Sequence, residues 1–109
     1  MIGEFEYLVL TSALRLGEEA YGATIRLDVE SISGRSCSVG ALYTTLDRLE
    51  SKKLIQTSMG DATPQRGGRP KRMVRLTLGG LEAATEFRET ILRASRGIEW
   101  KTSPKPARS

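Results

Sequence analysis

Apolar residues recur at three- and four-residue steps through the first part of the chain, a spacing typical of amphipathic helices. The pattern predicts a first helix over 4–16, which Gly17 ends by supplying a left-handed residue. A second helix with less regular spacing is predicted over about 21–32, and Gly34 ends it. We therefore expect the chain to begin with a compact pair of helices.

A third helix is predicted over 38–52 and has the clearest start, because Ser38 is a favourable N-cap. One stripe of its helical wheel is apolar and is expected to face the core: Val39, Leu42, Leu46 and Leu49. The opposite side is small and hydroxylated: Gly40, Ala41, Thr44, Asp47, Arg48 and Ser51, with Tyr43 at its flank. Such an outer face suits a helix that must lie close to another molecule.

The second part of the chain has strand patterns followed by a helix pattern. Residues 54–59 and 72–77 have the residue pattern of two β-strands and are expected to form a hairpin. The segment 60–71 between them contains Gly and Pro and is expected to be an irregular loop. A last helix is predicted over 78–100, and the tail 101–109 is expected to be disordered. The order helix, helix, helix, hairpin, helix predicts a mainly α fold with a small β-hairpin wing, a winged helix-turn-helix plus a C-terminal helix.

Charge is distributed unevenly along the chain. Residues 1–34 hold two basic and six acidic residues, whereas residues 35–76 hold nine basic and three acidic ones. The hairpin loop and the returning strand contribute five of these cations: Arg66, Arg69, Lys71, Arg72 and Arg75. The basic central part of the chain is typical of a protein that binds a polyanion. A solvated loop whose charge serves solubility explains the same pattern about equally well.

The composition excludes most catalytic chemistry. The 109 residues include no histidine and one cysteine, Cys37, so neither a histidine-activated nucleophile nor a zinc site can be assembled. Glu82, Glu86 and Glu89 are expected to form a solvated face, since no set of metal ligands accompanies them. We predict neither an enzyme nor a cofactor or metal, and we expect Cys37 to be a small buried residue rather than a redox sensor.

No targeting segment or membrane-spanning run is present in the sequence. Together with the single cysteine, which excludes an internal disulfide framework, this predicts a cytoplasmic protein without a membrane partner.

Four sequence blocks resemble the PadR family of bacterial winged-helix transcriptional regulators, and together they extend over about residues 3–95. The blocks are GEFE at 3–6, AYGATI at 20–25, SVGALYTTLDRLE at 38–50 and RGGRPKR at 66–72, the last followed by RLT. The resemblance implies a homodimeric DNA-binding protein, usually a repressor, that dimerises through its last helix. It also implies the short form of the family, without a separate C-terminal domain.

On this basis we expect residues 1–77 to be the DNA-binding domain, 78–100 the dimerisation helix and 101–109 a disordered basic tail. The sequence departs from the family at Lys53, where glycine is usual, and at Ile91, where some short members that bind flat aromatic drugs have tryptophan. The only tryptophan is Trp100, so the sequence does not support such a drug-binding pore. A small-molecule effector, with a pocket at Phe87 and Ile91, stays an unsupported alternative.

The residues expected to contact DNA lie on the third helix, which would enter the major groove, and on the wing. They are Ser38, Gly40, Ala41, Tyr43, Thr44, Arg48, Arg66, Arg69 and Lys71. For Gly40 and Ala41, simple tolerance of small residues explains the sequence about equally well. For Thr44 and Arg48 the alternative is ordinary solvent exposure.

The last helix carries an apolar seam without an obvious partner in so short a chain: Ala83, Phe87, Ile91, Ala94 and Ile98. We expect this seam to form the core of a two-fold homodimer, which would bind an inverted-repeat operator in double-stranded DNA. The alternative is a winged-helix module for protein–protein interaction, in which the basic wing meets an acidic partner.

Overall fold

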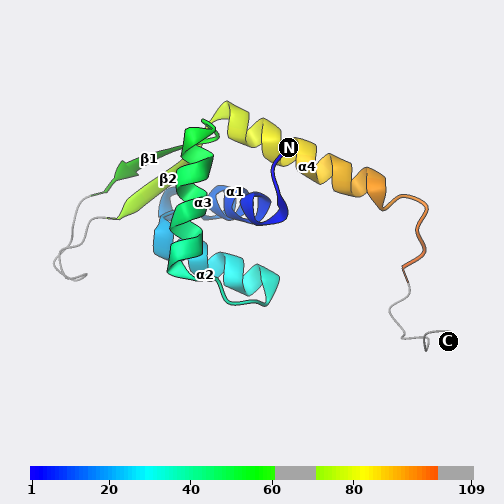
Figure 1. The fold of residues 1–109 in the computed structure, drawn as a ribbon, viewed down its shortest axis with the longest axis horizontal. Coiled ribbons are helices and arrows are strands. Elements are labelled where there is room, and N and C mark those ends of the chain that lie inside the picture. Colours follow the sequence, from blue (N-terminus) through cyan, green and yellow to red (C-terminus); the bar gives the residue numbers. More distant parts are fainter. Residues whose placement is uncertain (61–70, 101–109) are drawn as a thin grey trace.

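The computed structural model describes residues 1–60 and 71–100 and has the predicted architecture, mostly helical with a two-stranded antiparallel hairpin (Figure 1). The described elements are α1 (Glu4–Leu16), the 3₁₀ turn η1 (Gly17–Glu19), α2 (Gly22–Ser33), α3 (Val39–Ser51), β1 (Ile55–Met59), β2 (Arg72–Leu76) and α4 (Leu78–Ala94). The expectations for residues 61–70 and 101–109 lie outside the described residues.

Local sequence signals explain where the helices begin and end. The Ser38 hydroxyl accepts a hydrogen bond from the Ala41 N–H at 3.0 Å, which caps α3 as expected. Gly34 ends α2 with a φ of 72°, a left-handed conformation that glycine adopts without strain. Gly17 also has a positive φ, but its ψ of −120° leads into η1 rather than into a left-handed cap.

The core lies where α1, α2 and α3 meet, with the hairpin against its edge. Its largest fully buried side chains include Leu10, Ile25, Leu42, Leu46 and Leu49. Each belongs to an apolar stripe that the helical spacing predicts, so burial of these stripes supplies the main stabilisation of the body.

The hairpin pairs Ile55 with Leu76 at its base and Met59 with Arg72 at the start of the wing. It is held to the body through its backbone, because the Val74 N–H donates to the Ala20 carbonyl at 3.0 Å. The two strands are slightly shorter than the predicted 54–59 and 72–77.

Helix α4 extends from the body on the side opposite to the hairpin (Figure 1). Its start is fixed at the junction with the hairpin: the Thr77 hydroxyl donates to the Lys53 carbonyl at 2.8 Å and accepts from the Gly80 N–H at 3.1 Å. A Cβ on Gly80 would overlap the Leu54 carbonyl, so only glycine allows this close approach.

Two expectations for the last helix are wrong. The helix ends at Ala94 rather than at Trp100, and Gly97 beyond it has a φ of 76°. The apolar seam also has a partner within the chain, since the Phe87 ring lies 4.8 Å from the Tyr7 ring, between centroids. No helix in the described part of the chain is long and apolar enough to cross a membrane.

Candidate nucleic-acid interface

The outer face of α3 is solvent-exposed and is built mostly from short side chains, with Arg48 as the exception. Gly40, Ala41, Thr44 and Arg48 are all exposed, whereas Leu42, Leu46 and Leu49 behind them are fully buried. Ser38 is exposed at the N-terminal end of the same helix. Arg48 is exposed and forms no ion pair with another described residue.

Val39 does not face the core as predicted. It is the first residue of α3 and is 55% exposed, next to Gly40 and Ala41. The helical wheel predicts an inward direction for Val39, but the buried positions of α3 begin one turn later, at Leu42. Its position directly after an N-cap was the signal that sequence reasoning missed.

Tyr43 lies at the flank of this face and is half-buried. Its hydroxyl packs over Gly22 at the start of α2, where a Cβ would overlap it. This contact places the phenol oxygen at the N-terminus of α2, an end of a helix that attracts anions.

The wing is only partly described. Lys71 is half-buried, and its ammonium lies 4.5 Å from the centroid of the Tyr21 ring. Arg66 and Arg69 lie outside the described residues. Arg72, one of the two cations of the returning strand, forms ion pairs with Asp47 and Glu50 of α3.

Residues 10–86 match the transcriptional regulator PadR-like family. The chain belongs to this family. Comparison with curated proteins found no significant match.

Solved structures share the fold of this PadR-like chain. The complex structure of hsRosR-S1 is 30% identical with a TM-score of 0.67, covering 89% of this chain and 79% of that one. A PadR family transcriptional regulator from Eggerthella lenta is 25% identical, with a TM-score of 0.64 and coverages of 83% and 76%. A transcriptional regulator from Clostridium thermocellum has a TM-score of 0.69 at 18% identity, covering 84% and 85%, which shows the fold alone.

Two carboxylates fix the PadR-like body that carries α3. Burial alone would raise the pKa of Glu6, but hydrogen bonds from the Gly3 N–H and Lys52, with the Lys52 and Arg48 charges, hold this pKa below its ordinary value. Asp28 accepts hydrogen bonds from Arg15 and Ser12, and these lower its pKa. The first carboxylate joins α1 to the end of α3, and the second joins α1 to α2.

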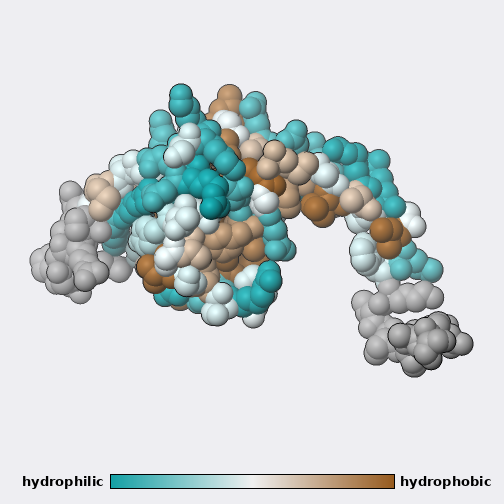
Figure 2. Space-filling model, in the orientation of Figure 1, coloured by the Kyte–Doolittle hydropathy of each residue, from teal (hydrophilic) through white to brown (hydrophobic). Residues whose placement is uncertain are grey.

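The expected dimer residues fall into two groups. Ala83 and Phe87 are half-buried against their own chain, whereas Ile91, Ala94 and Ile98 are exposed. Figure 2 shows the apolar residues gathered along the lower side of α4 in that view, while its upper side is hydrophilic.

The remaining sequence expectations concern Cys37 and metal binding. Cys37 is buried, as expected, and burial, followed by the charge of Glu30, raises the pKa of its thiol. No group of three or more possible metal ligands exists in the described ranges 1–60 and 71–100.

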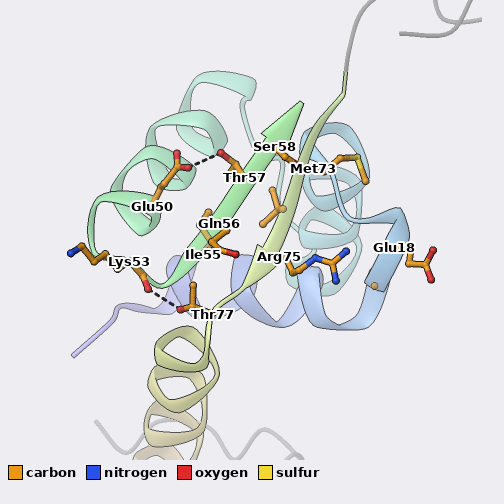
Figure 3. Close-up of a pocket in the computed structure, with 12 residues that line it drawn as sticks. Glu18, Glu50, Lys53, Ile55, Gln56, Thr57, Ser58, Met73, Arg75 and Thr77 are labelled. Carbon is orange, nitrogen blue, oxygen red and sulfur yellow. Dashed lines mark hydrogen bonds between the residues drawn. The ribbon is translucent and has the colours of Figure 1, made fainter. Parts of the chain in front are cut away.

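A groove of about 780 Å³ runs along the hairpin, and its lining mixes Glu18 and Glu50 with Lys53 and Arg75 (Figure 3).

Proposed function

We propose that this PadR-like protein is a sequence-specific DNA-binding repressor that acts as a homodimer. The observation that carries the proposal is the outer face of α3, where exposed Gly40, Ala41 and Thr44 form a surface of small side chains beside the single long side chain of Arg48. A helix with such a face fits a major groove about 12 Å wide, in which small residues allow close approach to the bases.

The distribution of charge also supports binding of DNA by α3 and the wing. The basic residues of the chain concentrate in residues 35–76, which contain α3 and the wing, while residues 1–34 are mainly acidic. We expect Ser38, Tyr43 and Lys71 to contact phosphates, together with Arg66 and Arg69 of the wing. Thr44 and Arg48 are the candidates for base contacts, with Val39 and Ala41 beside them.

Dimerisation is supported by the exposed apolar residues of α4 and its C-terminal extension. Ile91 is 51% exposed, Leu92 49% and Ile98 50%, all on the part of the chain that extends past the body. A second copy related by a two-fold axis would bury them and place two α3 helices on one face of the duplex.

Selection from a pool of random duplexes, followed by competition binding with the recovered sequence, tests the proposed function. We expect an imperfect inverted repeat that binds at least about a thousandfold more tightly than mixed-sequence DNA. Equal affinity for both would contradict the proposal and would favour a winged-helix module that binds an acidic protein partner.

The sign of regulation needs a separate measurement. We expect a promoter containing the selected site to lose transcription when the protein is added to a reconstituted system. Increased transcription would contradict the repressor assignment without affecting the DNA-binding assignment.

A further inference from the structure

The side chain of Arg72, at the start of β2, reaches across to α3. Its Nη1 lies 3.0 Å from Asp47 Oδ1, and its Nη2 donates to Glu50 Oε1 at 3.0 Å. Its Cζ lies 6.0 Å from the centroid of the Tyr43 ring. Because Tyr43, Asp47 and Glu50 follow one another at steps of four and three, they form one stripe along α3. Arg72 therefore binds along this stripe from outside the helix.

The other strand of the hairpin joins the same group. The Thr57 hydroxyl donates to Glu50 Oε2 at 2.7 Å (Figure 3). Together with the bond from Arg72, both β1 and β2 are therefore bonded to the Glu50 carboxylate. This hydrogen bond and the Arg72 guanidinium hold the pKa of Glu50 below its ordinary value, which keeps the carboxylate ionised at neutral pH. Arg72 pairs with Met59 in the last pair of the described ladder, at the start of the wing. The base of the wing is thus fixed against α3.

The ion pair of Arg72 with Asp47 changes the charge of the outer face of α3. The Asp47 side chain is 71% exposed and belongs to the outer face of α3, beside Thr44 and Arg48. A carboxylate on a surface that meets phosphates weakens binding through like-charge repulsion unless a cation neutralises it. The Arg72 side chain is itself only 18% exposed, so its charge is directed to its carboxylate partners rather than to solvent.

We propose that Arg72 is a positioning residue for DNA binding, which offsets the negative charge of Asp47 and Glu50 on the recognition helix and fixes the base of the hairpin against α3 without contacting phosphate itself. This inference rests on the proposed function. It differs from the simpler interpretation of Arg72 as one more wing cation, because that interpretation predicts a direct phosphate contact.

Binding of the full-length variants to a mixed-sequence duplex of about 30 base pairs, measured over a series of salt concentrations, separates the two interpretations. We expect Arg72→Gln to weaken binding roughly tenfold, while the salt slope changes by much less than the roughly 0.9 of a lost phosphate contact, because the variant exposes a repulsion and loses no phosphate contact. The double variant Asp47→Asn/Arg72→Gln should recover most of this loss, since it removes the carboxylate that Arg72 neutralised.

Arg75→Gln is the matched control, because it removes the same charge from the same strand. Arg75 forms no ion pair among the described residues and points away from α3, toward the side of Glu18 (Figure 3). Adding Asp47→Asn to the Arg75→Gln variant should not restore any affinity for DNA. A salt slope that falls by about 0.9 in Arg72→Gln, without recovery in the double variant, would overturn the inference in favour of a phosphate contact.

A measurement without DNA tests the contact with the wing directly. We expect Arg72→Gln to speed amide hydrogen exchange about tenfold at the wing end of the hairpin, near Met59, and Arg75→Gln to leave it unchanged. Equal exchange in wild type and Arg72→Gln would overturn the positioning role. Failure of the wild type to bind any duplex would instead contradict the proposed function, so the two failures are distinguishable.

Discussion

Lys53 has a φ of 63°, the one positive value among the described residues that are not glycines. Its backbone is needed in this conformation, because its carbonyl accepts the Thr77 hydroxyl and its N–H donates to the Glu50 carbonyl at 2.9 Å. A side chain in the left-handed region costs about 1–2 kcal/mol. The glycine that the family usually has at this position would remove that strain.

We therefore expect Lys53→Gly to raise the free energy of unfolding by about 0.5–1 kcal/mol, the relief of strain less the added entropy of the unfolded chain. Chemical denaturation measures this difference. Lys53→Ala is the control, because it removes the charge and keeps the Cβ. An equal gain in both variants would attribute the effect to charge and contradict the argument from φ.

Val39 is the second residue whose surroundings carry a prediction. If its exposed methyl groups contact a thymine methyl, Val39→Ala should cost about 1 kcal/mol on the selected operator. Replacing that thymine with deoxyuridine should cost the wild type a similar amount and the variant almost nothing.

Ile32→Ala provides the comparison for Val39, because Ile32 is also β-branched and 55% exposed but lies near the end of α2. We expect it to leave the effect of deoxyuridine intact. A full deoxyuridine effect in Val39→Ala would show that Val39 does not read the methyl group.

At the level of elements, the sequence predicts the order and type of the described α-helices and strands, because their apolar stripes and caps are local signals, but it does not predict the 3₁₀ turn η1. It fails where the deciding contact is distant in sequence. The ring contact of Phe87 with Tyr7 and the ion pairs of Arg72 with α3 join segments that no local pattern relates. The end of α4 was misplaced because Ile98 and Trp100 continue the apolar spacing after the helix has stopped.

The link between α1 and α3 predicts a dependence of stability on pH. The pKa of Glu6 is lower in the folded protein than its ordinary value of 4.5, so its contribution is complete above that value and is lost as the pH falls through the folded pKa. We expect Glu6→Gln to reduce stability at pH 7 and to flatten the decline of stability below about pH 4.5.

Urea denaturation at a series of pH values measures this effect. Glu4→Gln is the matched control, because the Glu4 side chain is 72% exposed and pairs only with the equally exposed Arg35 among the described residues. We expect Glu4→Gln to keep the acid dependence of the wild type. A Glu6→Gln variant with the same acid dependence as wild type would contradict the assignment.

At the level of the whole molecule, the exposed part of α4 predicts the oligomeric state. Ile91→Glu should weaken the proposed dimer by about a hundredfold, because it places a charge in a buried apolar contact. Leu27→Glu, at a 57% exposed position of α2, should leave the dimer intact. Sedimentation across a concentration series measures both, and a wild type that stays at 12.0 kDa would contradict dimerisation.

The proposed dimer also constrains its operator. Two α3 helices related by a two-fold axis would enter major grooves one turn apart, about 10 base pairs centre to centre. Inserting about five base pairs between the half-sites should abolish specific binding, because it rotates one half-site to the opposite face of the duplex. Footprinting of a spacer series measures this, and undiminished binding would exclude a symmetric dimer on the DNA.

The close approach of Gly80 to the Leu54 carbonyl fixes the direction in which α4 leaves the body. The helix spans 17 residues, about 25 Å, so a rotation of about 10° at this junction would move its far end by about 4 Å. Since the proposed dimer contacts lie toward that end, the junction would determine the separation of the two recognition helices. A side chain at residue 80 would then alter which half-site spacing the protein accepts, and Gly80 would act as a determinant of operator geometry although it touches no base.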